Sequence, residues 1–192
     1  RSPATDVYTI DQARELSLLS RALGRQRGML IDRKGRVDMV LVGEAGGILI
    51  PELPRARSGA DRLRGLRLLH THLTPDGLSQ EDLMDLLFLR LAAIIVLTVN
   101  PDGAPVQWQE APLLPTPVAG RMVQRAAQVN PKFILGKGKM AEREVLALEG
   151  RAGTLVFDGE LSPAQLHNLA DITERKVLDR TQLILDIFAQ HA

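Results

Sequence analysis

The chain has 192 residues, of which 45% are hydrophobic and 24% are charged, a balance typical of a globular protein that can bury a core. A net charge of +1 argues against a protein that is basic throughout, and the absence of cysteine excludes disulfides and thiolate metal sites. The most apolar run, residues 86–99, is shorter than a membrane span and contains Arg90. No secretory signal is visible, so we expect a cytoplasmic protein with no membrane partner.

The first half of the chain alternates helical and strand-like patterns. Apolar residues at helical spacing predict a helix within residues 10–28, with Asp11 as its N-cap and Gly28 near its end. A second helix is predicted at residues 79–92, with Ser79 at its N-cap. Short apolar runs bounded by glycine or charged residues predict strands at residues 28–32, 37–43, 46–50, 66–72, 94–100 and 106–111.

Three prolines, Pro112, Pro115 and Pro117, are expected to interrupt the sheet and mark a domain boundary. Beyond them, helices are predicted at residues 140–150, 162–172 and 180–192, and strands at 154–159 and 176–179. Strands that alternate with helices favour a parallel sheet with crossover helices. The prediction is an α/β protein with a mixed-sheet domain over residues 1–112 and a small parallel-sheet domain over 113–192.

The second half resembles the N-terminal region of the HflX family of ribosome-associated GTPases. Three stretches carry the likeness: "GKGK" before a predicted helix, "FDGELSPAQLHNL", and "KVLDRTQLILDIFAQHA". The last of these departs from the family pattern at His191, where an arginine is usual. The first half is similar to the extra domain that long-form members carry in front. The resemblance implies an N-terminal fragment that associates with the large ribosomal subunit and its rRNA.

The resemblance also implies a GTPase domain after residue 192, with GTP and Mg²⁺ as its ligands and this fragment as its partner. The 192 residues contain no G-x-x-x-x-G-K-[ST] motif, and "GKGK" has the wrong spacing for one. We therefore expect no cofactor and no GTP hydrolysis in the fragment itself, and we read "GKGK" as a turn that leads into a helix.

The strongest basic segment spans residues 121–143, where six basic residues accompany a single acid, Glu142. From the pattern alone, such a run is more often a solvated face. The HflX resemblance makes rRNA contact the better interpretation, through phosphates and RNA shape, since the chain has few aromatic residues for base stacking. The candidate RNA-binding residues are Arg121, Arg125, Lys132, Lys137 and Lys139.

Residues 70–82 also resemble the signature of the JAMM (MPN) metalloproteases, H-x-H followed by S-x-x-D at a helix start. His70, His72 and Asp82 match the zinc ligands of that family and Ser79 matches its serine. Two histidines and a carboxylate suit zinc, which leaves a fourth position open in catalytic sites. A carboxylate base would then be needed to accept a proton.

The chain departs from the JAMM pattern in three places. The gap between His72 and Ser79 is one residue shorter, and Leu73 replaces the usual proline. At the first helix-to-strand junction, residues 25–27 read Arg-Gln-Arg where the family has its glutamate base.

Three interpretations follow: an inert JAMM-like scaffold without metal, a scaffold that keeps structural zinc, and a zinc-dependent hydrolase. Without any metal, His70 and His72 simply share one face of a strand and Asp82 pairs with one of them. The missing base favours the inert scaffold. We expect the three residues to lie close together and to support no peptidase activity.

Overall fold

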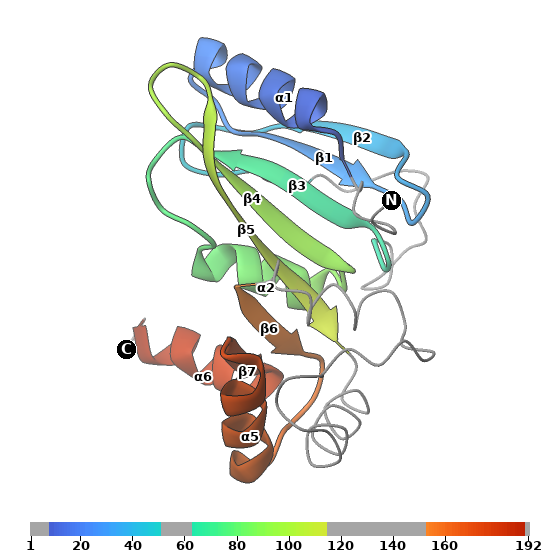
Figure 1. The fold of residues 1–192 in the computed structure, drawn as a ribbon, viewed down its shortest axis with the longest axis vertical. Helices are drawn as coiled ribbons and strands as arrows, with labels where there is room; N and C mark the ends of the chain where they lie inside the picture. The colour runs from blue at the N-terminus through green and yellow to red at the C-terminus, as the bar shows by residue number, and fades with distance from the viewer. Residues whose placement is uncertain (1–7, 51–62, 115–152, 191–192) are drawn as a thin grey trace. The chain divides into compact units, whose positions relative to one another are not determined.

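The computed structural model describes residues 8–50, 63–114 and 153–190, and it confirms the α/β class. The helices are α1 (Ile10–Leu23), α2 (Gln80–Phe88), α5 (Pro163–Thr173) and α6 (Arg180–Gln190). The strands are β1 (Arg27–Ile31), β2 (Val37–Val42), β3 (Arg67–His72), β4 (Ala93–Val99), β5 (Pro105–Leu114), β6 (Thr154–Phe157) and β7 (Lys176–Asp179), all labelled in Figure 1.

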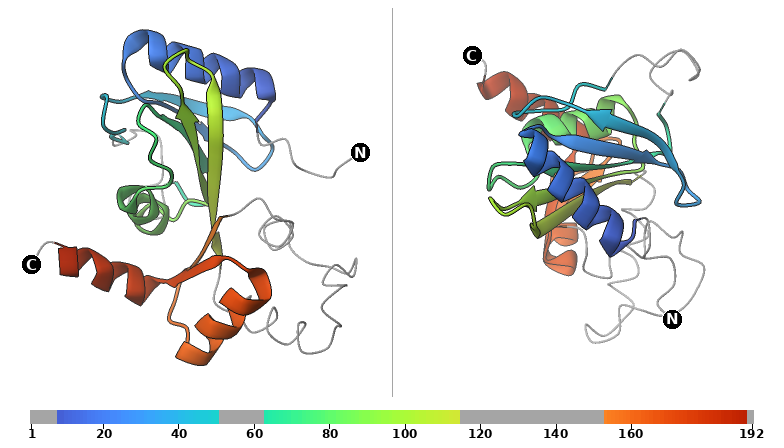
Figure 2. Two further views of the ribbon diagram at one scale, coloured as in Figure 1. Left: turned by 60° about the vertical axis from the view of Figure 1, so that its left-hand side comes forward. Right: turned by 90° about the horizontal axis from the view of Figure 1, so that it is seen from above.

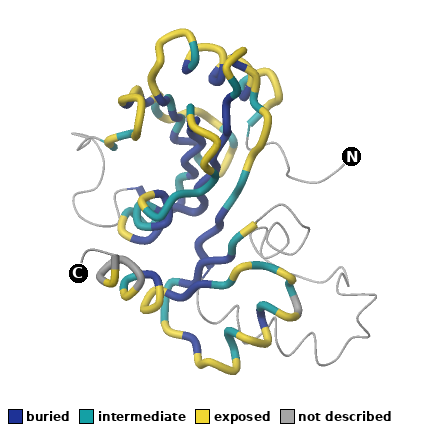
Figure 3. The backbone as a smooth tube through the Cα atoms, turned by 90° about the vertical axis from the view of Figure 1, so that its left-hand side faces the viewer, coloured by how far each residue is buried: buried dark blue, intermediate teal, exposed yellow. Residues whose placement is uncertain are grey.

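The first part of the sheet is mixed, as predicted. β1 pairs antiparallel with both β2 and β3, whereas β3 and β4 run parallel. Every residue of β3 and β4 is buried, and Figure 3 shows the buried backbone concentrated in these strands. Parallel strands with covered faces favour continuous apolar sequences, which explains the Ala-Ile-Ile-Val-Leu-Thr-Val run of β4.

Helices α1 and α2 cover opposite faces of this part of the sheet. Thr71 reaches α1 through a 2.6 Å hydrogen bond with Ser20, whereas its neighbour His70 reaches Asp82 of α2. Successive strand residues point to opposite faces, so the two helices must lie on opposite sides, as Figure 2 shows. The α1 side holds an aliphatic core made of Ala13, Leu16, Ile31, Leu69, Ile95 and Leu97.

The start and end of α1 differ from the prediction. Thr9, not Asp11, is the N-cap: its side chain accepts a hydrogen bond from the Gln12 amide, and the Gln12 side chain accepts one from the Thr9 amide. This reciprocal pair satisfies two amides that the helix itself leaves unpaired. The helix ends at Gly24, whose φ of 61° lies in the left-handed region that favours glycine.

The strand predicted at residues 46–50 is wrong. The chain reverses direction after β2, where the Glu44 amide donates to the Gly47 carbonyl at 2.8 Å, and no strand forms. The reversal brings residue 48 back over the sheet, and a Cβ at Gly43 would collide with the Gly47 backbone. Glycine is therefore required there by close packing, and Ile48 packs on the sheet instead of forming part of a strand.

The proline prediction is also wrong in part, because Pro112 lies inside β5. Proline has a φ compatible with extended backbone and removes only one ladder donor. The strand order is β2-β1-β3-β4-β5 in the first group of elements and β5-β6-β7 in the second. Contacts divide the chain between Glu110 and Ala111, so β5 contributes residues to both groups. A boundary between independently folding domains at residue 112 stays a prediction.

The second group of contacts contains the predicted parallel arrangement. β6 runs parallel to both β5 and β7, and α5 begins as predicted, with Ser162 as N-cap and Pro163 in the first turn. Its core consists of Leu114, Leu155, Phe157, Leu161 and Leu169. The predicted helix at residues 140–150 and the "GKGK" turn lie outside the described residues.

Asp179 connects two segments of this second group through hydrogen bonds. The carboxylate is 4% exposed and accepts hydrogen bonds from the Leu161 amide at 3.0 Å and the Gln182 amide at 2.7 Å. It therefore links the segment after β6 to the first turn of α6.

We expect Asp179→Ala to lower the free energy of unfolding by about 1–3 kcal/mol, because two buried amides lose their acceptor. Urea denaturation of the chain measures the effect. Asp171→Ala is the control, since Asp171 is exposed and pairs only with the exposed His167. A loss no larger than that of the control would contradict the role of Asp179.

Candidate metal centre

β3 delivers two histidines to one face of the sheet. His70 and His72 are two residues apart, so their side chains point the same way, and they are 3% and 6% exposed. Thr71 between them points to the α1 side, where it accepts a hydrogen bond from the Arg27 amide at 3.0 Å. The register of β3 is thus fixed from the opposite face, which holds both imidazoles at the α2 side.

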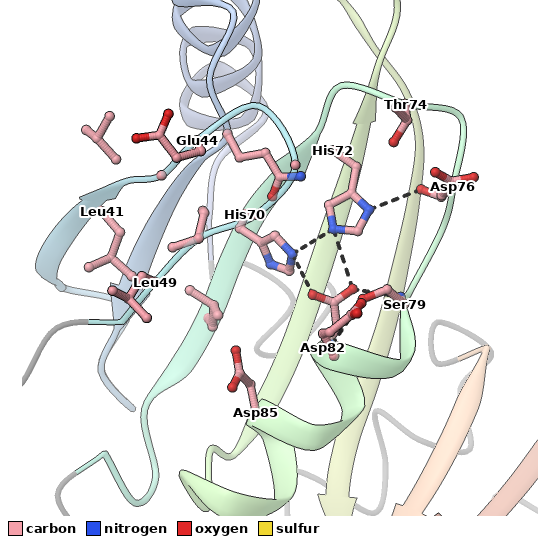
Figure 4. Close-up of a pocket in the computed structure, with 18 of the residues that line it drawn as sticks. Leu41, Glu44, Leu49, His70, His72, Thr74, Asp76, Ser79, Asp82 and Asp85 are labelled. Carbon is pink, nitrogen blue, oxygen red and sulfur yellow. Dashed lines mark hydrogen bonds and ion pairs between the residues drawn. The ribbon is translucent and has the colours of Figure 1, made fainter. Parts of the chain in front are cut away.

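Helix α2 presents Asp82 to these histidines. Ser79 caps the helix: its hydroxyl accepts a hydrogen bond from the Asp82 amide at 3.1 Å, and the Ser79 amide donates to Asp82 Oδ2 at 2.7 Å. The same capping box that starts the helix therefore orients the Asp82 carboxylate. One oxygen is held by the cap, and both face the imidazoles, as Figure 4 shows.

The three side chains converge on one point. His70 Nε2 lies 2.9 Å from Asp82 Oδ1, His72 Nε2 lies 3.4 Å from Asp82 Oδ2, and the two Nε2 atoms are 3.0 Å apart. The structure thus brings together the three residues named from the sequence as candidate metal ligands.

The remaining imidazole nitrogens differ in their partners. His72 Nδ1 lies 3.3 Å from the Asp76 carbonyl oxygen, and a carbonyl can only accept, so Nδ1 carries the proton and donates. His70 Nδ1 is buried and has no hydrogen-bond partner among the described residues. A donor on one ring nitrogen fixes the tautomer and frees Nε2 for a metal, an arrangement typical of metal-binding histidines.

Burial and charge act in opposite directions on these groups. Burial raises the pKa of Asp82, but hydrogen bonds from His70 and His72 outweigh it and hold that pKa well below its usual value. Burial lowers the pKa of His72, but the hydrogen bond and negative charge of Asp82 outweigh it, so the pKa is raised. Burial and the nearby Asp82 charge both raise the pKa of Asp85. The Asp82 carboxylate and the His72 imidazole therefore stabilise each other's charged forms.

The donor set fits a zinc ion. In a tetrahedral site with bonds of about 2.0–2.1 Å, neighbouring ligand atoms lie about 3.3–3.4 Å apart. The three observed separations, 2.9, 3.0 and 3.4 Å, need only small adjustments to reach that value. Within the described part of the chain, His70, His72 and Asp82 form the group of three side chains whose ligand atoms lie close enough together to hold a metal ion.

The junction between α1 and β1 supplies no carboxylate. Gln26 is 4% exposed, and its side-chain amide donates to the Ala45 carbonyl at 3.5 Å. Arg25 forms an ion pair with Glu44 at 3.2 Å. Glu44, the next glutamate along the sequence, is therefore held by an arginine.

A cleft of about 980 Å³ opens beside the triad and was not predicted from the sequence. We call it the histidine cleft; it is lined by β2, residues 43–49, His70, His72 and the first turns of α2, including Asp85. Gly28 lets the returning segment pack closely on the sheet beside it, because a Cβ there would lie 3.1 Å from Ile48 Cδ1 and 3.2 Å from His70 Cβ. Glycine at a strand position where another segment approaches closely is the signal that could have indicated it.

Comparison with known proteins concerns the other end of the chain. Residues 114–189 match the family described as GTP-binding GTPase N-terminal. The GTPase HflX of Flavobacterium psychrophilum is 49% identical over 75 residues, which cover 39% of this chain and 18% of that protein. The GTPase HflX of Escherichia coli is 48% identical over 63 residues, or 33% of this chain and 15% of that protein. No solved structure matches the chain.

Residues 114–189 are therefore similar in sequence to the N-terminal region of HflX GTPases. The chain spans less than a fifth of the length of the HflX relatives it matches. The match begins at the last residue of β5 and includes β6, α5, β7 and nearly all of α6.

The candidate RNA-binding residues fall inside this HflX region but outside the described residues. They are Arg121, Arg125, Lys132, Lys137 and Lys139. None of the described helices is both long and apolar enough to cross a membrane.

We expect Asp82→Asn to lower the free energy of unfolding by about 1.5–3 kcal/mol in the presence of a chelator, because two buried imidazoles lose a charged partner. The loss should depend on pH. The contribution of Asp82, whose folded pKa is lowered, is present above the unfolded value near 3.9 and disappears as pH falls through the folded pKa. The contribution of His72, whose folded pKa is raised, is complete below about 6.5 and disappears as pH rises through the folded pKa.

Urea unfolding of the wild type and Asp82→Asn should therefore differ most between about pH 4 and 6.5. The exposed Asp171→Asn change serves as the control. If the difference in unfolding free energy between the two proteins were constant from pH 3 to pH 9, the carboxylate and the imidazoles would not interact through their charges.

Proposed function

We propose that the chain is the N-terminal region of an HflX-type GTP-binding protein and that it attaches this protein to the large ribosomal subunit. The observation that carries the proposal is the family match over residues 114–189. We assign GTP and Mg²⁺ binding to another part of the whole protein, because these residues contain no phosphate-binding motif. Such a partner places the protein in the cytoplasm.

The basic segment at residues 121–143 supports RNA as the surface that is bound. Six basic residues with one acid give it a local charge opposite to that of phosphates, although the whole chain has a net charge of only +1. Gly136 and Gly138 flank Lys137, and glycine, which lacks a Cβ, allows a backbone to approach phosphates closely. Recognition by phosphates and shape also agrees with an aromatic content of 3%.

Replacement of Lys137 and Lys139 by alanine should weaken association with the large subunit and flatten its salt dependence by roughly one to two units, because each lysine that neutralises a phosphate releases a counterion. Co-sedimentation over a range of salt concentrations measures the slope. The experiment uses a chain that includes the GTPase domain, which adds a second attachment.

Lys34→Ala with Lys176→Ala is the matched control, since it removes the same charge from two exposed lysines elsewhere. If the Lys137 and Lys139 variant and the control gave the same slope as the wild type, the two lysines would not contact RNA. If both variants flattened the slope equally, only net charge would matter.

We propose as a second function that His70, His72 and Asp82 hold a zinc ion. The specific observation is the convergence of three ligand atoms at separations of 2.9, 3.0 and 3.4 Å, with His72 Nδ1 donating to a backbone carbonyl. A zinc ion bound there would supply Lewis acidity. The chain's own groups argue for a structural role, because Gln26 and Arg25 occupy the junction where the JAMM resemblance calls for a base.

Chelator-treated protein should bind zinc with one site per chain, measured by competition with a fluorescent chelator. Loss of a residue that hydrogen-bonds a zinc ligand lowers zinc affinity about 10–100-fold. His72→Ala removes a ligand itself, so it should lower the affinity by at least that factor. His167→Ala is the control, because this histidine lies on the exposed face of α5. We expect no peptidase activity in the zinc-loaded protein. Equal zinc binding by both variants, or none by the wild type, would exclude the site.

A further inference from the structure

The histidine cleft has two walls of different chemistry. On one side stand β2 and residues 43–49, with Leu41 and Leu49 facing the opening; Leu49 is 86% exposed. On the other side, Ser79, Asp82 and Asp85 project from α2, with the two histidines between the walls, as Figure 4 shows. An apolar wall and an acidic wall thus face each other across one opening.

The charge of the cleft has a single sign. None of the described residues that line it is lysine or arginine. Five of them carry carboxylates, namely Glu44, Asp76, Glu81, Asp82 and Asp85. Arg25 neutralises Glu44 from outside, and Asp82 is paired with the histidines. In the described part of the chain, Asp76, Glu81 and Asp85 form no ion pair, so the cleft keeps an unbalanced negative charge.

Among the described strands, none pairs with the outer edge of β2, which borders this cleft. β2 is the terminal strand of the described sheet, and β1 is its one partner there. The Gly43 amide donates to the Gln26 carbonyl, which fixes the alternation of the antiparallel ladder. By that alternation, the N–H and C=O groups of Val40 and Val42 point away from β1. Both side chains are also exposed, at 54% and 51%.

The floor of the cleft contains a further unsatisfied group. His70 is 3% exposed and lines the cleft, and its Nδ1 has no hydrogen-bond partner among the described residues. A buried polar atom without a partner is costly, so it favours a ligand that brings a hydrogen-bonding group.

We propose that the histidine cleft binds an extended, positively charged segment of a polypeptide, which adds to the edge of β2 as a further strand. Strand addition gives backbone hydrogen bonds to Val40 and Val42, and side chains then alternate between the two faces of the sheet. Alternate lysine or arginine side chains face the carboxylates of α2, and the intervening apolar side chains lie beside Val40 and Val42. RNA is disfavoured, because its phosphates would meet the unbalanced carboxylates.

The inference goes beyond both proposed functions, since it requires neither a bound metal nor the basic segment at residues 121–143. In a ribosome-associated protein, it assigns this cleft to a basic protein segment and leaves RNA to the other part of the chain.

The test is fluorescence anisotropy with the whole 192-residue chain in the presence of a chelator, so that zinc binding does not enter. The probe is a labelled eight-residue peptide of alternating lysine and valine. It should bind with an affinity that falls as salt rises, whereas the same peptide with glutamate in place of lysine, and a single-stranded RNA oligonucleotide, should not bind. Binding of either negative probe as strongly as the lysine peptide would overturn the proposal.

Two variants examine the two walls separately. Glu81→Gln with Asp85→Asn should weaken binding of the lysine peptide by about three- to tenfold, whereas the matched control Asp171→Asn with Glu174→Gln, on α5 and its C-cap, should leave it unchanged. Val42→Pro removes an outward-pointing donor that β1 does not use, so it should abolish binding while urea unfolding shows an intact chain. Unchanged binding in the first variant would exclude the acidic wall, and unchanged binding in a folded Val42→Pro protein would exclude strand addition.

Discussion

The carboxylate of Asp82 connects the first turn of α2 to β3, and the geometry of the site depends on it. It accepts hydrogen bonds from two imidazoles and from the Ser79 amide, while it is only 7% exposed. A buried carboxylate without such partners would cost several kcal/mol. Because the same residue is part of the capping box, the start of α2 cannot shift without disturbing the histidines. The position of α2 and the geometry of the site formed by His70, His72 and Asp82 are therefore determined together.

The position of the cleft follows from which parts of the sheet are covered. On one face, α1 packs against β1, β3 and β4. On the other face, α2 packs against β4, and Asp82 reaches β3, while residues 43–49 return over β1 and β2. Ligands in α/β sheets commonly lie at the carboxyl ends of parallel strands, and His72 is the carboxyl-terminal residue of β3. The face of the sheet is incompletely covered beside that strand end, and the cleft therefore lies there, next to the outer edge of β2.

Local patterns in the sequence were sufficient for most elements and for the triad. The two-residue spacing of His70 and His72 and the Ser79 cap predict a shared strand face and a helix start, and both are found. Other features, some of them local and some dependent on strand pairing, became clear only from the structure. The reversal at Glu44 and Gly47 turned an expected strand into a cleft wall, and the position of Pro112 within β5 became clear only from the pairing of the strand. The choice of Thr9 over Asp11 as cap depends on a reciprocal bond with Gln12, since either residue type can cap a helix.

The electrostatics of the chain are local, and this limits what its total charge can indicate. A net charge of +1 is the sum of a basic segment at residues 121–143 and an acidic cleft on the first group of elements, among other charges. At physiological ionic strength the Debye length is about 8 Å, so each of these surfaces acts on a partner mainly through its own charges. The proposed contacts with RNA and with a basic peptide therefore depend on the local charges of residues 121–143 and of the cleft, and the net charge of the chain indicates neither. A nearly neutral chain can therefore carry proposed sites for ligands of opposite charge, because net charge does not report where along the sequence its acids and bases lie.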